Sequence, residues 1–207
     1  PKNQLSYIMG NPPFVGYSLQ SKEQKNDMLS IYVDEKGKPY KTAGKIDYVA
    51  GWYFKAAQLM QNTGIRTAFV STNSITQGEQ VASVWKPLYQ RFGIHIDFAH
   101  RTFIWDSEAN LKAHVHCVIV GFSTVMNAKK RVLYSSDRFQ MVININAYLV
   151  DGPDVFVESN KKPICDVPEM IYGNKPTDGG FLFLTQEEKE EVTKNEPDIV
   201  KYIRKMY

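Results

Sequence analysis

The chain has 207 residues, of which 43% are hydrophobic and 23% are charged. This composition supplies enough apolar side chains for a folded core and excludes an intrinsically disordered chain. The net charge of +3 is too small to indicate a nucleic-acid partner by itself, although it permits one. The longest nearly continuous apolar run, residues 115–122, is far too short for a membrane-spanning helix, so we expect no membrane association.

The cysteines and the N-terminus point to a cytoplasmic protein. Two cysteines, Cys117 and Cys165, cannot form a disulfide framework, and Cys117 lies in an apolar run typical of a small buried side chain. Residues 1–4 contain neither an initiator methionine nor an apolar signal core. We therefore expect an excised piece of a longer protein that functions in a reducing compartment.

Strand-like and helix-like segments alternate at the start of the chain, which predicts an α/β layered sheet. Residues 5–9 are a short apolar run that ends at turn-forming residues, and we interpret them as a buried strand. Residues 17–45 are polar and are predicted to form a long surface loop, a length that suggests a function. From Ile46 to Met60 the apolar residues recur at helical spacing, and Gly64 is predicted to end this helix.

Hydrophobic spacing then predicts a strand, a helix and two antiparallel strands, over residues 65–70, 78–89, 94–98 and 113–122. Pro87 should kink or restart the helix, and Gly93 should cap it. Residues 101–112 are predicted to be the loop that joins the last two strands.

After Phe122 the chain becomes rich in Pro, Gly, Asn and Asp. We expect a first domain over residues 1–125, and a connector leading into a second region over residues 126–207. The run from Thr185 to Glu188 matches a capping box, which predicts a short helix to about Asn195 and another that begins at Pro197.

The most informative residues are Asn11, Pro12, Pro13 and Phe14, directly after the first predicted strand. The structural alternative is a rigid turn that only stops the strand. Ligands of open α/β sheets, however, bind beyond the carboxyl ends of the strands. Two consecutive prolines remove two N–H donors, so this turn presents mainly carbonyl acceptors.

Such a turn could hold an aromatic amine. The side-chain oxygen of Asn11 and the carbonyl of Pro12 could accept both hydrogens of an –NH₂ group, which favours a pyramidal nitrogen with a directed lone pair. The same oxygens stabilise the positive charge that develops on the nitrogen during attack. Phe14 would stack on the ring and orient it.

The tetrapeptide resembles the catalytic motif of S-adenosylmethionine-dependent DNA methyltransferases that modify adenine N6 or cytosine N4. A closer resemblance is to the MmeI-like group, which are single-chain restriction–modification enzymes with nuclease, methyltransferase and DNA-recognition parts. The segments that carry it span residues 8–16, 71–74, 77–80, 103–105, 113–122, 163–168 and 173–180.

The resemblance implies the C-terminal half of a class I, Rossmann-like methyltransferase sheet with an antiparallel last strand. Asn11, Pro12, Pro13 and Phe14 match the catalytic positions. An aromatic residue from the loop between the last two strands covers the flipped target base in this family, and Phe103, then Trp105, match that role. Base flipping is needed because the adenine amine is paired and stacked inside a duplex.

The implied cofactor is S-adenosylmethionine and the implied partner is double-stranded DNA. The family's Gly-rich cofactor loop is not visible in this sequence and lies upstream in MmeI-like enzymes, so we expect the isolated chain to bind the cofactor weakly and to be inactive. Asp47 and Trp52 are candidates for a wall of the cofactor pocket. His114 and His116 lack a third ligand at suitable spacing, so we expect no metal site.

Two alternatives stay open. One is a methyltransferase that acts on a protein glutamine amide or an RNA guanine amine, since their catalytic turns are similar. The other is a DNA-binding module without catalysis. Adenine rather than cytosine follows from the resemblance alone, and a dimer formed through an exposed sheet edge is a further possibility.

Overall fold

The computed structural model describes residues 2–105, 115–125, 130–136, 138–160, 162–168 and 177–205. The chain divides into two compact units, Pro1–Ser159 and Asn160–Tyr207. In the described ranges, no helix is both long and apolar enough to cross a membrane.

The first unit is built on a mixed sheet with the strand order β1-β2-β4-β3-β5-β6. The strands are β1 (Tyr7–Gly10), β2 (Arg66–Thr72), β3 (His95–Trp105), β4 (Val115–Ser123), β5 (Arg131–Ser135) and β6 (Arg138–Val142). β1 pairs with β2, and β3 with β5, in parallel, whereas β4 runs antiparallel to both β2 and β3. β6 is antiparallel to β5. The predicted α/β fold with an antiparallel late strand pair is therefore confirmed.

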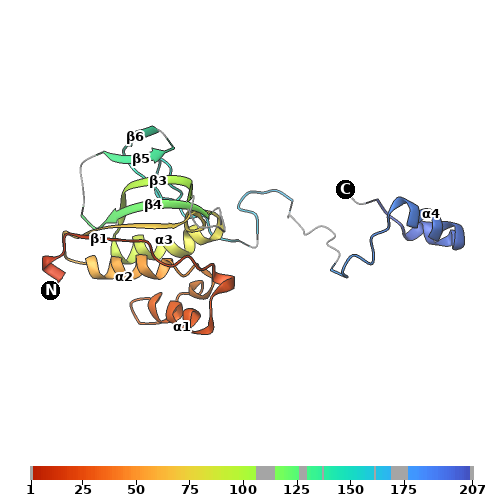
Figure 1. The fold of residues 1–207 in the computed structure, drawn as a ribbon, viewed down its shortest axis with the longest axis horizontal. Coiled ribbons are helices and arrows are strands. Elements are labelled where there is room, and N and C mark those ends of the chain that lie inside the picture. Colours follow the sequence, from red (N-terminus) through yellow and green to blue (C-terminus); the bar gives the residue numbers. More distant parts are fainter. Residues whose placement is uncertain are drawn as a thin grey trace. The chain divides into compact units, whose positions relative to one another are not determined.

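Three helices, α1 (Lys22–Ile31), α2 (Ala50–Met60) and α3 (Gly78–Phe92), lie on the same side of this sheet (Figure 1). The core between helices and sheet is aromatic. The ring of Tyr53 on α2 lies 5.2 Å from Phe69 of β2, 5.3 Å from Trp85 of α3 and 5.2 Å from Phe122 of β4. All four side chains are buried, so α2 and α3 are anchored to the middle of the sheet by one ring cluster.

The prediction of a surface loop over residues 17–45 is wrong. This segment contains α1, which begins with a capping box: Ser21 Oγ accepts from the backbone N–H of Gln24, and the Gln24 side chain accepts from that of Ser21. Only Met28 of α1 is buried, so the helix has no apolar stripe for the sequence to reveal. Tyr32, directly after it, is fully buried and donates from its hydroxyl to the carbonyl of Val84.

The first strand is not buried as predicted. β1 lies at the edge of the sheet and pairs with β2 alone, and Tyr7 and Met9 keep 69% and 79% of their surfaces exposed. Ile8, which points to the opposite face, packs on the core. The apolar run forms a strand, as predicted, but its burial depends on neighbours that no local pattern specifies. Dimerisation through this edge stays a prediction.

Several predicted boundaries shift. The second helix begins at Ala50 rather than Ile46, although Ile46 is fully buried in the turn before it, and the helix ends at Met60, ahead of Gly64. α3 does not restart at Pro87, because it continues to Phe92 as one helix. Gly93 follows it in the left-handed conformation, at φ +63°, as predicted.

The sheet also extends further along the chain than expected. Residues 101–105, predicted as loop, belong to β3, whereas residues 106–114 lie outside the described ranges. β5 and β6 both follow the boundary that we place at residue 125, and they add to the sheet beside β3. β5 and β6 form a hairpin, and β5 joins the sheet by pairing with β3, about 34 residues earlier in the chain.

The second unit contains α4 (Gln186–Asn195) and a 3₁₀ helix over Pro197–Tyr202. The predicted capping box is confirmed: Thr185 Oγ1 accepts from the backbone N–H of Glu188, and the Glu188 carboxylate accepts from that of Thr185. Pro197 stands in the first turn of the second helix, as predicted.

At the amino end of β3, Asp97 lies in a polar cluster that should affect acid stability. Its carboxylate is 3.3 Å from His95 Nε2, and His95 Nε2 is 3.4 Å from Ser123 Oγ. Burial raises the pKa of Asp97, but hydrogen bonds from His95 and Ser123 and the positive charges of His95 and Arg66 outweigh it, so the pKa is lowered. Ionised Asp97 therefore stabilises the folded state.

We predict that Asp97→Asn lowers the free energy of unfolding at neutral pH, and that its difference from wild type shrinks as the pH falls. The reason is that a carboxyl with a lowered folded pKa contributes fully above its unfolded value of about 4 and loses this contribution as it is protonated below it. Urea denaturation between neutral and acidic pH measures the difference. Asp151→Asn, at an exposed aspartate of the same unit, is the control. A difference that grows on acidification would contradict the assignment.

Candidate functional site

The tetrapeptide begins directly after the carboxyl end of β1. Asn11 and Pro13 are exposed, Pro12 is buried and Phe14 is half-buried. The loop thus presents the Asn11 amide to solvent while Pro12 anchors it to the fold. Since both prolines lack an N–H, the main chain of this turn offers more hydrogen-bond acceptors than donors.

Several other strands end or begin at the same edge of the sheet. β2 is parallel to β1 and ends at Thr72, which pairs with Cys117 near the start of β4. Cys117 also pairs with Phe103, near the end of β3. The loop at residues 11–14, the residues after β2 and the end of β3 therefore share one edge, where parallel α/β sheets bind ligands.

The two predicted base-covering aromatics lie at this edge, but not next to the loop. Phe103 is half-buried and Trp105 is 44% exposed, with their ring centroids 6.3 Å apart. Because β2 and β4 intervene between β1 and β3, three strand spacings, about 14 Å, separate these strands laterally. The two aromatics and the loop therefore lie at the same edge of the sheet but on strands that are not neighbours, and the base-covering role stays a prediction.

Asp47 lies directly beside the tetrapeptide loop. It is only 6% exposed; its Oδ1 accepts from the Tyr17 backbone N–H at 2.9 Å, and its Oδ2 accepts from the Ser74 hydroxyl at 2.5 Å. Trp52, in the first turn of α2, is half-buried and packs edge-on against Tyr48 at 5.1 Å. Both candidates lie near the loop, but the Asp47 carboxylate is already bonded to protein donors.

Sequence reasoning missed the role of three polar side chains around Asp47. In the sequence, Ser74 and Gln80 stand out only as parts of segments that resemble the MmeI-like group. In the structure, the Gln80 side chain accepts a hydrogen bond from the Asp47 backbone N–H at 3.0 Å. Gln20 is 6% exposed and donates from Nε2 to the Ile46 carbonyl at 2.9 Å. These partners are 26 to 33 residues apart, so no local signal could have paired them.

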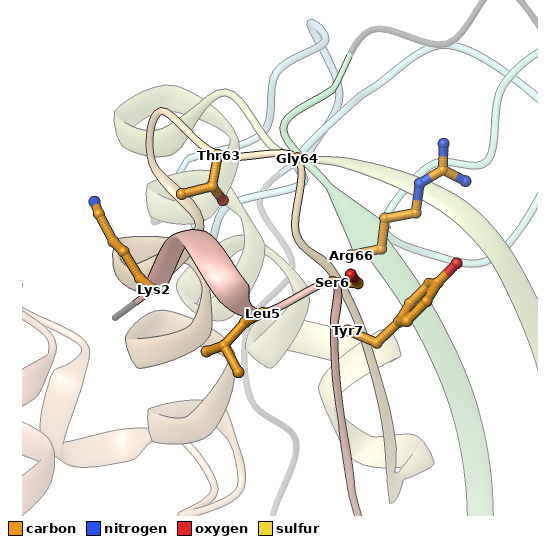
Figure 2. A pocket seen from close by; sticks show the side chains of 7 residues that line it. All are labelled: Lys2, Leu5, Ser6, Tyr7, Thr63, Gly64 and Arg66. Atoms are coloured by element: carbon orange, nitrogen blue, oxygen red, sulfur yellow. The ribbon is translucent and has the colours of Figure 1, made fainter.

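A cavity of about 430 Å³ lies elsewhere, at the amino ends of β1 and β2. Figure 2 shows its lining residues, which are Lys2, Leu5, Ser6, Tyr7, Thr63, Gly64 and Arg66. Tyr7 and Arg66 are register partners on the two strands. Because the tetrapeptide follows the opposite end of β1, this cavity is not part of the site described above.

The structure describes Cys117 and His116 but not His114, so only part of the cysteine and histidine predictions can be compared with it. Cys117 is buried, as predicted, and burial raises the pKa of its thiol. His116 is exposed on β4, and His114 lies outside the described residues. Within the described part of the chain, no group of three or more His, Cys, Asp or Glu residues could hold a metal ion.

Comparison with known proteins decides the family. Residues 2–135 match the model of the MmeI DNA-methyltransferase domain. The chain belongs to the MmeI DNA-methyltransferase domain family. Residues 151–207 match a second model, the MmeI target recognition domain. The resemblance inferred from the motifs is thus confirmed.

Two relatives of the MmeI family extend this result. DNA methyltransferase A of Bacillus subtilis (strain 168) is 41% identical over 199 residues, which are 96% of this chain and 22% of that protein. A solved structure of the type IIL restriction–modification enzyme MmeI in complex with DNA has 47% sequence identity and a TM-score of 0.82, over 95% of this chain and 26% of that one. The chain therefore has the MmeI methyltransferase fold, and spans about a quarter of the length of these relatives.

Proposed function

We propose that this chain carries the amine-binding loop of an S-adenosylmethionine-dependent methyltransferase that modifies adenine N6 in double-stranded DNA, within a restriction–modification enzyme. One observation supports this above all: an exposed Asn11 amide followed by two prolines, at the carboxyl end of β1 and beside that of β2. This is where an open α/β sheet binds its ligand.

We assign the roles from the motif that these residues match and from their position at that edge. Asn11 and the Pro12 carbonyl accept the two hydrogens of the target amine and stabilise the positive charge that develops on it. Phe14 packs against one face of the base. Phe103, or Trp105 beside it, covers the opposite face of the base, which excludes water and fixes the ring. Pro13 keeps the turn rigid.

S-adenosylmethionine supplies an electrophilic methyl group when it is bound. Trp52, half-buried at the start of α2, is the described aromatic that we assign to a wall of its pocket. Asp47 suits this role less well, since each carboxylate oxygen already accepts a hydrogen bond from the protein. The sequence holds no strand followed by a Gly-rich turn and a helix, so we expect the 207 residues alone to transfer no methyl group.

We propose that residues 1–125 contribute to catalysis and that the region from residue 126 onward leads into DNA recognition. The match to the recognition-domain model, over residues 151–207, supports the second part of this proposal. The first compact unit extends past this boundary to Ser159, because β5 and β6 belong to its sheet. Location in the cytoplasm follows from the same proposal, because DNA is the substrate.

Labelled methyl transfer tests the proposal in the full-length protein. With unmethylated genomic DNA as the acceptor, we expect label in N6-methyladenine after digestion to nucleosides. Label in N4-methylcytosine instead would overturn adenine as the target. Label in protein or RNA but not in DNA would favour the glutamine or guanine alternative, and DNA binding without transfer would favour a non-catalytic module.

A further inference from the structure

Asp47 connects two segments that belong to different parts of the sheet edge. Tyr17, whose N–H it accepts, lies three residues beyond Phe14, and Ser74, whose hydroxyl it accepts, follows the end of β2. Ser74 Oγ is in turn 2.9 Å from Thr72 Oγ1, on the last residue of β2. One buried carboxylate thus joins the tetrapeptide loop to the neighbouring strand.

The residues on both sides of Asp47 reinforce this connection. The Tyr48 backbone N–H donates to the Val15 carbonyl at 2.9 Å, directly beyond Phe14. The Asp47 N–H donates to the Gln80 side chain on α3, and the Ile46 carbonyl accepts from Gln20. Residues 46–48 are therefore hydrogen-bonded to the chain after the tetrapeptide on one side and to α3 on the other.

The charge of Asp47 has no described ion-pair partner. In the described ranges the ion pairs are Lys86–Glu158 and His95–Asp97. A nearly buried carboxylate is costly unless hydrogen bonds compensate it, and its two bonds both end on segments of the site edge. A side chain that only filled this space would not need a charge. The placement of Asp47 is therefore explained by the two segments that its carboxylate holds together through hydrogen bonds to Tyr17 and Ser74.

We propose that Asp47 is a positioning residue for methyl transfer, which holds the Asn11–Phe14 loop at a fixed distance from the carboxyl end of β2. This inference rests on the proposed function. It replaces direct cofactor contact as the role of Asp47. A displacement of about 1 Å at reacting atoms can lower a rate about 100-fold, so a fixed loop matters more for the chemical step than for binding.

Three variants of the full-length protein test the proposal, with methyl transfer to unmethylated genomic DNA as the readout. Asp47→Ala removes both bonds and should lower kcat by roughly 10- to 100-fold with little change in the KM for S-adenosylmethionine or DNA. Asp47→Asn should keep most of the rate, since its amide oxygen can accept from Tyr17 and its amide N–H can donate to Ser74 Oγ. Ser74→Ala removes one bond and should lower kcat by less than Asp47→Ala.

The matched control is Asp27→Ala. Asp27 is an exposed aspartate that accepts from the Tyr48 hydroxyl at 2.9 Å, so it supports the same segment without touching the tetrapeptide loop. This variant should keep the wild-type kcat. A comparable loss of kcat in Asp27→Ala would overturn the specific role of Asp47.

The remaining outcomes separate this proposal from the proposed function. A wild-type kcat in Asp47→Ala, or a raised KM for S-adenosylmethionine at unchanged kcat, overturns the positioning role. If Asp47→Ala fails to fold, a lowered kcat in Ser74→Ala beside an active Asp47→Asn supports it, and an unchanged kcat in Ser74→Ala overturns it. If Asn11→Ala is inactive while Asp47→Ala is fully active, this inference alone fails. If Asn11→Ala keeps full activity, the proposed function of the loop fails.

Discussion

Replacing Asn11 with alanine is expected to lower the methyl-transfer rate of the full-length protein about 100-fold or more. The variant removes the side-chain oxygen that holds one amine hydrogen and stabilises the charge developing on the nitrogen. Because Asn11 is exposed at the end of β1, the fold should be unaffected. Steady-state transfer of labelled methyl groups to unmethylated DNA measures the loss, and thermal unfolding checks that the variant is folded.

Two further substitutions sharpen this test. Asn11→Asp keeps an oxygen acceptor at the same place and should retain part of the rate. Asn26→Ala removes an exposed asparagine on α1, remote from the loop in sequence, and should behave as wild type. Undiminished transfer by Asn11→Ala would rule out the catalytic role assigned to the tetrapeptide.

The largest expected effect on stability comes from Gly121→Ala. Gly121 on β4 pairs with Phe98 on β3, and the Phe98 ring occupies the space that a side chain on Gly121 would take. A Cβ placed on Gly121 would lie 2.1, 2.4 and 2.7 Å from three atoms of that ring. Since such distances are far below van der Waals contact, the ring has to move, and we expect the free energy of unfolding to fall by about 1–3 kcal/mol. Urea denaturation measures it.

The matched control for this clash is Gly64→Ala, because a Cβ at Gly64 would meet no atom within 4 Å and the residue has no positive φ. It should leave stability near that of wild type. In a Phe98→Ala background, Gly121→Ala should cost little, since the obstructing ring is gone. Equal costs of Gly121→Ala in the two backgrounds would show that the clash is not the cause.

Local patterns sufficed where a residue's role depends on its immediate neighbours in the chain. The alternation of Ile94, Ile96 and Phe98 with polar residues predicts a strand, and β3 begins at His95 and includes Ile96 and Phe98. Likewise the capping box at Thr185 and the left-handed Gly93 are properties of a few consecutive residues. The tetrapeptide at residues 11–14 is also a local pattern, because two prolines restrict the backbone wherever they occur, and its catalytic role stays a prediction.

Patterns failed where long-range contacts decide the outcome. The burial of Tyr32 depends on Phe54, whose ring centroid is 4.5 Å away, and on Val84, whose carbonyl takes its hydroxyl. A polar helix with a single buried residue gives no periodic signal, so the pattern predicts a loop where the structure has α1. For the same reason the local pattern predicts a buried first strand, whereas exposure depends on which strands pair with it.

The chemistry proposed for the site therefore rests on four consecutive residues, whereas the contacts that support them appear only in the structure. Asn11, Pro12, Pro13 and Phe14 form one turn after one strand, and their backbone restraints and acceptors are local. Asp47 meets Tyr17 and Ser74 only because β1 and β2 pair in parallel and end at the same edge. Hydrogen bonds between residues about 30 positions apart become favourable only after folding has brought the segments together, because closing such loops costs entropy that the whole core must offset.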